Sequence, residues 1–204
     1  SNGKTTVTSL TYHICKHAGL DCALVGNIGI SIAKQVALDP KEVYVAEISS
    51  FQLDDIKDFR AEIAVLTNIT EDHLDRYEYK FENYIKAKFK IAQNQTANDV
   101  FIYCADDPVT IKYLNKLTLN SNPLPFTMNQ EPQKGAFIKD GNMTIAVNDD
   151  KVTMSVDDFK IKGKHNQYNT MAAGIAAATL GIRKEKIREA VTTFESLEHR
   201  MEYV

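Results

Sequence analysis

SNGKTTVTSLTYHICKHAG, residues 1–19, is the stretch from which the fold of this chain can be read. Its polar opening leads directly into apolar residues at helical spacing, namely Val7, Leu10, Ile14 and Ala18, and Gly19 is a natural end for that helix. Gly-Lys-Thr at the start of a helix is the second half of the P-loop pattern. A P-loop ordinarily follows a buried strand, and none precedes Ser1, so we expect the chain to lack the start of its own domain.

Outward from this stretch, short apolar runs alternate with segments of helical character. The runs that read as buried strands are 22–25, 43–48, 63–67 and 100–103. The helical segments are one ending near Ala37, then 81–93, 108–117, 166–180 and 184–194. Buried strands that alternate with helices predict an α/β fold, with a mostly parallel P-loop-type sheet flanked by helices.

Residues 119–162 follow a different pattern. Alternating runs at 136–138 and 143–147 flank Asp140-Gly141-Asn142, which predicts a hairpin. We therefore expect a small antiparallel excursion on the parallel sheet. Because no linker interrupts the chain, residues 1–204 are predicted to form one domain.

Composition narrows the functional classes. The net charge is -3 with 44% hydrophobic residues, so no basic excess suggests nucleic acid and no polybasic run suggests a membrane surface. The three cysteines, Cys15, Cys22 and Cys104, are scattered in apolar surroundings, which favours buried thiols over disulfides or a zinc site.

The opening hexapeptide, Ser1-Asn2-Gly3-Lys4-Thr5-Thr6, has the residue types that bind phosphate. Backbone N–H groups at a helix N-terminus cradle phosphate oxygens, Lys4 is placed to neutralise them, and the Thr5 hydroxyl is a ligand for Mg²⁺. Taken alone, the hexapeptide fits a polar turn that caps a helix equally well.

Polar side chains also follow the predicted strands, where ligands of open α/β sheets bind. Glu47 ends one strand and suits Mg²⁺, or is a charge in solvent. His73 lies in a dense polar cluster, Thr67 to Asp75, after the next strand. Lys88 is by default interpreted as a solvated surface lysine. Asn166 and Asn169 share one helical face, which suits contact with a ligand, but Asn166 also fits a plain N-cap residue.

Together these segments resemble the Mur ligase family, the ATP-dependent amide-forming enzymes of peptidoglycan synthesis. The ordered set covers the whole chain: 1–6, Gly26-Asn27-Ile28-Gly29, Glu47-Ile48-Ser49-Ser50-Phe51-Gln52-Leu53, Asn68-Ile69-Thr70-Glu71-Asp72-His73-Leu74-Asp75-Arg76-Tyr77, Lys88, Ala105-Asp106-Asp107, Gly163-Lys164-His165-Asn166 and His199-Arg200. The residues after Glu47 look like those of the members that add D-glutamate to UDP-N-acetylmuramoyl-L-alanine through an acyl phosphate.

The resemblance implies a role for each matching residue. Lys4, Lys88 and His73 would be catalytic, and the ATP site would comprise Ser1, Asn2, Gly3, Lys4, Thr5, Thr6, Asn166, Asn169 and Arg200. Asn27, Ser49 and His73 would contact the muramoyl substrate. Two Mg²⁺ sites would draw on Thr5, Glu47, His73 and Lys88, with Lys88 carbamylated so that it becomes an anion.

The resemblance also implies a place in a longer protein. Family members have three domains, and this chain is similar to the central, ATP-binding one, so the flanking domains are expected to be absent and the isolated chain inactive. A bacterial, cytoplasmic enzyme of cell-wall synthesis, cell shape and cell division is implied. The alternatives are another Mur ligase, a folylpolyglutamate synthase-like ligase, a generic P-loop NTPase and a catalytically silent binding module.

Overall fold

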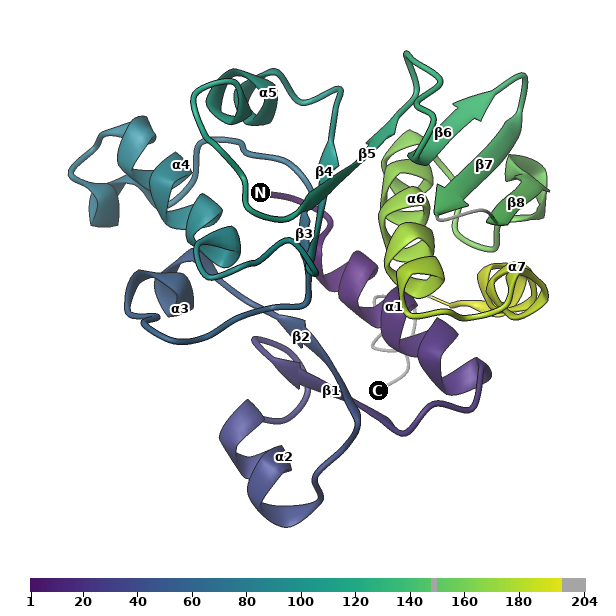
Figure 1. The fold of residues 1–204 in the computed structure, drawn as a ribbon, viewed down its shortest axis with the longest axis horizontal. Coiled ribbons are helices and arrows are strands. Elements are labelled where there is room, and N and C mark those ends of the chain that lie inside the picture. Colours follow the sequence, from purple (N-terminus) through teal and green to yellow (C-terminus); the bar gives the residue numbers. More distant parts are fainter. Residues whose placement is uncertain (148–149, 196–204) are drawn as a thin grey trace, which may run out of the picture.

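The computed structural model describes residues 1–147 and 150–195. Helices and strands alternate from α1 to β5, and α6 and α7 are the last elements of the described residues (Figure 1). In chain order the elements are α1 (Lys4–His17), β1 (Cys22–Gly26), α2 (Ile32–Leu38), β2 (Val43–Glu47), α3 (Ser50–Asp54), β3 (Ile63–Leu66), η1 (Leu74–Tyr77), α4 (Phe81–Phe89), η2 (Lys90–Ala92), β4 (Val100–Cys104), α5 (Pro108–Leu114), β5 (Asn122–Thr127), β6 (Gly135–Lys139), β7 (Asn142–Val147), β8 (Asp150–Ser155), η3 (Val156–Asp158), α6 (Lys164–Thr179) and α7 (Lys184–Thr193).

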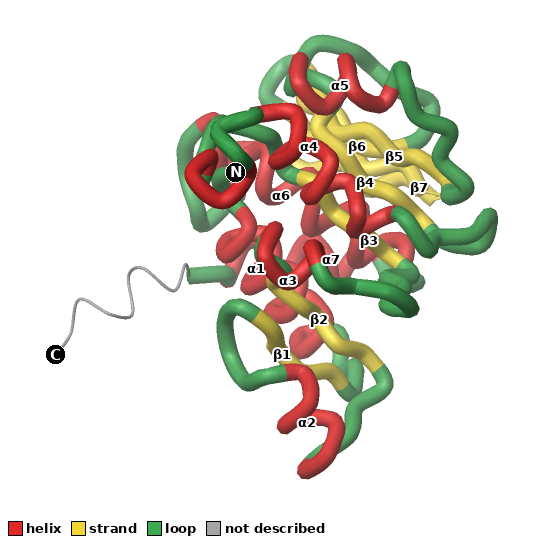
Figure 2. Tube along the Cα trace, turned by 90° about the vertical axis from the view of Figure 1, so that its left-hand side faces the viewer, coloured by secondary structure: helices red, strands yellow, loops and turns green. Residues whose placement is uncertain are grey.

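The described strands form two sheets. β1 and β2 pair in parallel, and a six-stranded sheet has the order β3-β4-β5-β6-β7-β8. Its first four strands are parallel, whereas β6, β7 and β8 pair antiparallel. Figure 2 shows β1 and β2, with α2, below the larger sheet. The predicted α/β class with an antiparallel section is therefore confirmed, with the sheet interrupted between β2 and β3.

Both faces of the parallel strands are covered. Along β4, Ile102 packs into a cluster with α1, α6 and α7, and Phe101 packs into a second cluster beside α4. Residues that alternate along a strand point to opposite faces, so β3 and β4 each contribute to both cores. The alanine-rich α6 lies close to the sheet, because a Cβ on Gly174 would stand 2.4 Å from Cδ1 of Ile145.

Residues 119–162 are only partly antiparallel, although the sequence predicted an antiparallel excursion for this section. β5 lies within it but is parallel to β4, and only β6 to β8 are antiparallel. Pro123 and Pro125 make this segment a poor match to the pattern of a strand, because proline has no N–H to donate to the hydrogen bonds between strands. The N–H of Asn122 donates to Asp99 O, so alternate residues face β4 and the two prolines fall on the other positions.

Two predicted helices are shorter than expected. The segment 81–93 is α-helical to Phe89 and continues as the 3₁₀ turn η2, and α5 ends at Leu114. Such ends are set by tertiary contacts rather than by apolar spacing.

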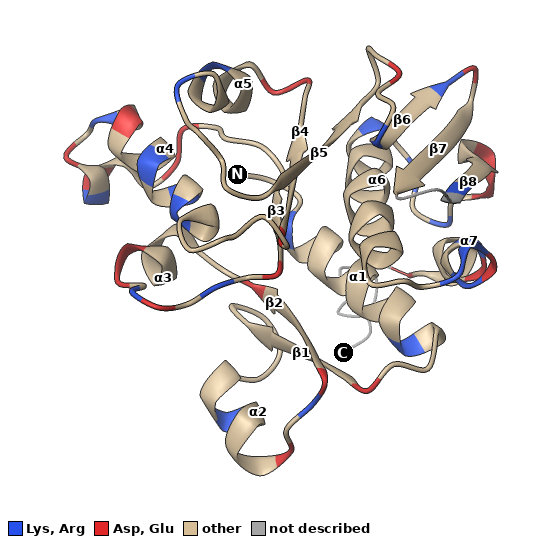
Figure 3. Ribbon diagram, in the orientation of Figure 1, with Lys and Arg blue, Asp and Glu red and all other residues tan. Residues whose placement is uncertain are grey.

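The structure also shows the state of the cysteines, the distribution of charges and the character of the helices. Cys15, Cys22 and Cys104 are buried free thiols, as predicted, and burial raises the pKa of Cys15 to about 12. Charges of both signs alternate along helices such as α7 (Figure 3). None of the helices in the described ranges has the length and apolar character that crossing a membrane requires.

Candidate phosphate-binding site

The turn before α1 is held in a fixed shape. Gly3 has φ 85°, a left-handed conformation that favours glycine. The Asn2 N–H donates to Asn68 Oδ1 at 2.9 Å, and Asn68 Nδ2 donates to Asn2 O at 2.9 Å. Lys4 Nζ donates to Ser1 O at 2.8 Å and to Ser1 Oγ at 3.1 Å, so its charge lies over the turn. Unpaired N–H groups at the start of α1 therefore stand beside a lysine, which is an arrangement for binding phosphate.

Helix α6 approaches this turn from the far end of the sequence. A Cβ on Gly3 would stand 2.3 Å from Asn169 Oδ1, so only glycine fits there. Asn169 is 9% exposed, and its Nδ2 donates to Asn166 Oδ1 at 3.2 Å. The structure thus brings Asn169 to the phosphate turn, with Asn166 hydrogen-bonded to it one helical turn away.

Thr5, Glu47 and Asn27 form one hydrogen-bonded group. Thr5 Oγ1 donates to Glu47 Oε2 at 2.8 Å, and Asn27 Nδ2 donates to Glu47 Oε1 at 2.8 Å. The Asn27 N–H also donates to Glu47 O at 2.8 Å. Parallel pairing of β1 with β2 places Gly26 opposite Glu47 and so brings Asn27 to the same sheet edge.

This group fits a magnesium ion. The Glu47 carboxylate is 3% exposed, and its two side-chain oxygens accept hydrogen bonds from neutral donors. A buried carboxylate is stabilised by a cation, and hard hydroxyl and carboxylate oxygens suit Mg²⁺. In 1–147 and 150–195 no cluster of three or more His, Cys, Asp or Glu side chains could hold a metal ion.

Lys88 is buried beside the same turn. It is 5% exposed, its Nζ donates to Ser1 Oγ at 3.0 Å, and this Nζ lies 5.2 Å from the ring centroid of Tyr84. Burial lowers the pKa of Lys88 to about 8, and the positive charge of Lys4 acts in the same direction. The default expectation of a solvated surface lysine is therefore wrong.

His73 stands at the edge of the site. It is the residue before η1, with φ 49°, and its ring lies 5.0 Å from that of Phe51. Its Nε2 is 3.5 Å from Asp72 Oδ1, and the other oxygen of Asp72 lies 3.6 Å from the Ser1 nitrogen. Asp72, rather than a direct contact, connects His73 to the turn that contains Ser1.

The other predicted site residues are less central. Ser49 is the N-cap residue of α3, and its side chain accepts a hydrogen bond from the Gln52 N–H at 3.3 Å. It lies two residues after Glu47, the last residue of β2. Thr6 continues the first turn of α1. Arg200 lies outside the described residues.

Two participants were not among the predicted site residues. Asn68 braces the turn through its paired bonds to Asn2, and Tyr84 places its ring under Lys88. Tyr84 precedes Lys88 by four residues in α4, so helical spacing alone puts both on one face. The contact between Asn68 and Asn2 had no comparable signal in the sequence.

Known proteins give independent information about this arrangement. Residues 1–177 match the family described as the Mur ligase middle domain. A UDP-N-acetylmuramoylalanine–D-glutamate ligase of Christiangramia forsetii is 48% identical over 204 residues, which are 100% of this chain and 46% of that protein. Its counterpart in Bacteroides fragilis is 49% identical over 208 residues, with the same shares. The chain thus spans about half the length of the curated relatives it matches.

Two solved ligase structures have a similar fold. The UDP-N-acetylmuramate:L-alanyl-gamma-D-glutamyl-meso-diaminopimelate ligase of Neisseria meningitides superposes with a TM-score of 0.72 at 18% identity, covering 97% of this chain and 64% of that one. MurF of Thermotoga maritima, solved in complex with ADP, gives 0.68 at 20% identity over 97% of this chain and 47% of that one. The likeness of fold and the family match agree: the chain belongs to the Mur ligase middle-domain family.

Proposed function

We propose that this chain is the ATP-binding part of a ligase that adds D-glutamate to UDP-N-acetylmuramoyl-L-alanine. The observation that carries the proposal is the phosphate turn of Gly3 and Lys4 beside the Thr5–Glu47 pair, in a chain 48% identical to a protein named for that reaction. In the whole protein this chain is the central domain, with a UDP-binding domain before it and an amino-acid-binding domain after it. It acts in the bacterial cytoplasm, in cell-wall synthesis.

The reaction has two steps. The terminal phosphoryl group of ATP passes to the carboxylate of UDP-N-acetylmuramoyl-L-alanine, which gives an acyl phosphate and ADP. The amine of D-glutamate then attacks the acyl carbon, so that an amide bond forms, phosphate leaves and the amine loses a proton. In both steps negative charge must be held in place, which is a task for positioned cations and N–H groups.

The residues of the turn meet that need. Lys4 and the first N–H groups of α1 bind the phosphates, and Thr5 and Glu47 hold Mg²⁺. Mg²⁺ bound there supplies positive charge that offsets the charge of the phosphates. Asn27, which donates to Glu47, and Ser49 face the muramoyl substrate, while Asn166, Asn169 and Arg200 line the nucleotide.

We also propose that Lys88 carries a carbamate that helps His73 to hold a second Mg²⁺. A neutral amine adds to CO₂, forming an N–C bond and releasing a proton, and the product is an anion. With a pKa of about 8, about one Lys88 amine in ten is neutral at pH 7, against about one in 3000 for an ordinary lysine. Incubation with ¹³CO₂ should give a carbamate ¹³C signal in the full-length protein that Lys88→Met removes and Lys86→Met keeps.

The reaction is tested on the full-length protein. With ATP, Mg²⁺ and UDP-N-acetylmuramoyl-L-alanine, phosphate release should occur with D-glutamate and with no other amino acid. Release with a different amino acid would keep the ligase but overturn its substrate. Phosphate release from ATP that ignores both substrates would indicate a generic NTPase instead.

A further inference from the structure

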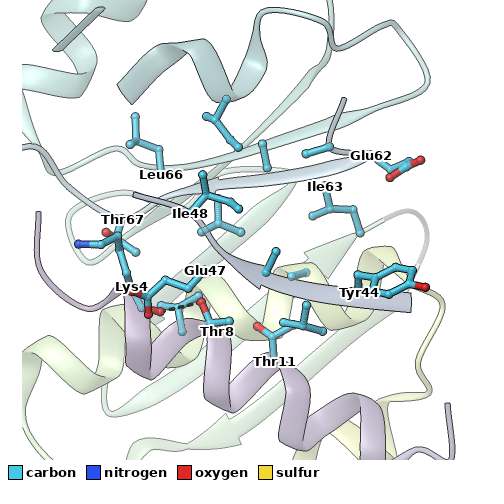
Figure 4. Close-up of a pocket in the computed structure, with 18 of the residues that line it drawn as sticks. Lys4, Thr8, Thr11, Tyr44, Glu47, Ile48, Glu62, Ile63, Leu66 and Thr67 are labelled. Carbon is cyan, nitrogen blue, oxygen red and sulfur yellow. Dashed lines mark hydrogen bonds between the residues drawn. The ribbon is translucent and has the colours of Figure 1, made fainter. Parts of the chain in front are cut away.

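The segment that follows β3 runs beside the phosphate turn. Thr67, Lys4 and Glu47 line a cavity of about 600 Å³, and Figure 4 shows them together at one end of it. β3 ends at Leu66, so Thr67 and Asn68 are the first residues beyond the carboxyl end of that strand. This edge is where ligands of open α/β sheets bind.

Asn68 makes a two-bond contact with the backbone of the turn. Its Oδ1 accepts from the Asn2 N–H at 2.9 Å, and its Nδ2 donates to Asn2 O at 2.9 Å. Only one orientation of the carboxamide satisfies both groups, because its oxygen cannot donate and its nitrogen does not accept. One side chain thus pairs with both backbone polar groups of Asn2.

These two bonds fix the peptide groups on either side of Asn2. The Asn2 N–H shares a plane with Ser1 O, and Asn2 O shares a plane with the Gly3 N–H, because peptide groups are planar. No cis peptide bond occurs within the described ranges, so the N–H and C=O of each peptide group point in opposite directions. Asn68 therefore sets the direction of Ser1 O and of the Gly3 N–H.

Both of these groups belong to the phosphate-binding arrangement. Ser1 O accepts from Lys4 Nζ at 2.8 Å, so its direction helps to decide where the charge of Lys4 lies. Gly3 is the N-cap residue of α1, and its N–H is one of the first N–H groups, which lack an acceptor within the helix. At a helix N-terminus such N–H groups point at a bound anion. Asn68 thus acts on one phosphate donor and on the anchor of one cation.

Burial contributes little to holding Asn2 in place. Asn2 is exposed, and its neighbour Gly3 has φ 85°, in a residue type that has many backbone conformations open to it. An exposed residue beside a glycine is not fixed by packing. The two bonds from Asn68 therefore restrict a segment that would otherwise sample several orientations.

Asn68 is itself held between two fixed neighbours. Thr67 is 8% exposed, and Ile69 is 2% exposed. The Ile69 N–H donates to Asp107 Oδ2 at 3.2 Å, and the same oxygen caps α5 by accepting from the Thr110 N–H at 3.0 Å. The carboxamide of Asn68 therefore projects from backbone that is tied to both β3 and α5.

We infer that Asn68 is a positioning residue for the nucleotide, because its carboxamide holds the peptide groups around Asn2 in the orientation in which the turn binds phosphate. The inference rests on the proposed function, since it requires that the turn binds ATP. Without the two bonds only a fraction of the molecules has the turn ready, and the apparent dissociation constant is the intrinsic one divided by that fraction. Two hydrogen bonds of ordinary strength change such a fraction by about tenfold or more.

The affinity of the full-length protein for ADP tests this role. Asn68→Leu nearly keeps the size of the side chain and removes both bonds, so calorimetry with ADP and Mg²⁺ should give a dissociation constant about tenfold or more above the wild-type value. Asn94→Leu is the matched control, because Asn94 Nδ2 also donates to backbone, to Lys57 O at 2.7 Å and Phe59 O at 2.8 Å, in the loop before β3. Its dissociation constant should equal that of the wild type.

Turnover separates positioning of the nucleotide from a general structural role. In Asn68→Leu the KM for ATP should rise, while the KM values for UDP-N-acetylmuramoyl-L-alanine and D-glutamate stay at the wild-type level. Asn68→Ala is the second variant if Asn68→Leu does not fold, and it should give the same result. In the nucleotide-free protein the amide signal of Gly3 should move in Asn68→Ala and stay in place in Asn94→Ala.

The outcomes distinguish this inference from the proposed function. Wild-type ADP binding with unchanged affinity in the Asn68 variants would overturn the inference alone. An equal rise of all three KM values would mark Asn68 as a general structural residue and would overturn it as well. A full-length wild type that binds no ADP would overturn the proposed function and the role of Asn68 together.

Discussion

At the scale of single residues, the carboxylate of Glu47 sets the chemistry of the site. It is buried, and it accepts from Thr5 and Asn27, which are neutral. A buried negative charge with neutral donors is stabilised further by a cation. The hydroxyl of Thr5 is the second oxygen at that place, so its removal should weaken Mg²⁺ binding without disturbing the fold.

Thr5→Val keeps the shape of the side chain and removes the hydroxyl. We expect the Mg²⁺ concentration for half-maximal phosphate release by the full-length protein to rise by about tenfold or more, the equivalent of one charge-assisted contact. Thr5→Ser retains the hydroxyl and should stay near the wild-type value. Equal Mg²⁺ dependence of the Val and Ser variants would argue against Thr5 as a ligand.

Lys88→Ala in the full-length protein should abolish amide formation, and bicarbonate should not restore it, because alanine has no amine to which CO₂ can add. Lys86→Ala is the matched control on the same helix, because Lys86 is exposed and its Nζ forms a surface ion pair with Glu82 Oε1 at 3.5 Å. Turnover is measured as phosphate release that depends on D-glutamate. Near-normal turnover of Lys88→Ala would refute the carbamate.

Lys88 also makes stability depend on pH. Its pKa is about 8 in the folded protein and near 10.5 when unfolded, so the unfolded chain holds more protons between these values. Relative to Lys88→Met in CO₂-free buffer, the free energy of unfolding of the wild type should be level below about pH 8. It should then rise by up to about 1.4 kcal/mol per pH unit toward pH 10.5. Urea unfolding at several pH values checks this, and parallel curves for wild type and variant would contradict the lowered pKa.

At the scale of elements, Asp106 ties three of them together at the end of β4. Its carboxylate accepts from Thr127 Oγ1 at 2.6 Å, from the Met128 N–H at 2.6 Å and from Tyr168 Oη at 2.8 Å. These donors belong to the end of β5, the residue after it, and α6. Although burial acts in the opposite direction, the hydrogen bonds lower the pKa of Asp106. The carboxylate thus holds α6, which carries Asn166 and Asn169, against the sheet.

Tyr168→Phe removes one donor to that carboxylate and should lower the free energy of unfolding by about 1.5–3 kcal/mol. Asp106→Ala should cost more, because three donors lose their acceptor. In the double variant the two losses should be clearly less than additive, since Tyr168 has no carboxylate left to bond. Thermal or urea unfolding gives the four values, and strict additivity would mean that the bond contributes nothing.

At the scale of the whole molecule, the chain contains a phosphate turn beside a cavity of about 600 Å³ but covers only 46% of the length of a curated relative. Under the proposed function, the amino-acid site lies in another part of the protein. The chain 1–204 should therefore show no phosphate release that depends on D-glutamate, even with ATP, Mg²⁺ and UDP-N-acetylmuramoyl-L-alanine present. The full-length protein assayed in parallel is the control, and D-glutamate-dependent release by the chain alone would refute this division of labour.

Local patterns in the sequence determined much of the fold. Residues 43–47 and 100–104 form strands because they are rich in β-branched and aromatic side chains, and α1 forms because its apolar residues recur every three or four positions. The order of the motifs also sufficed to recognise the family. These features depend on neighbours in the chain, so a single sequence contains them.

Only the tertiary structure decided the features that depend on distant residues. The break between β2 and β3, the parallel pairing of the proline-containing β5, and the approach of Asn169 to Gly3 all join segments far apart in the chain. The lowered pKa of Lys88 likewise arises from burial and from Lys4, which lies 84 positions away along the chain. Burial, pairing and electrostatic coupling are properties of packed neighbours in space, and sequence spacing alone does not specify which neighbours those are.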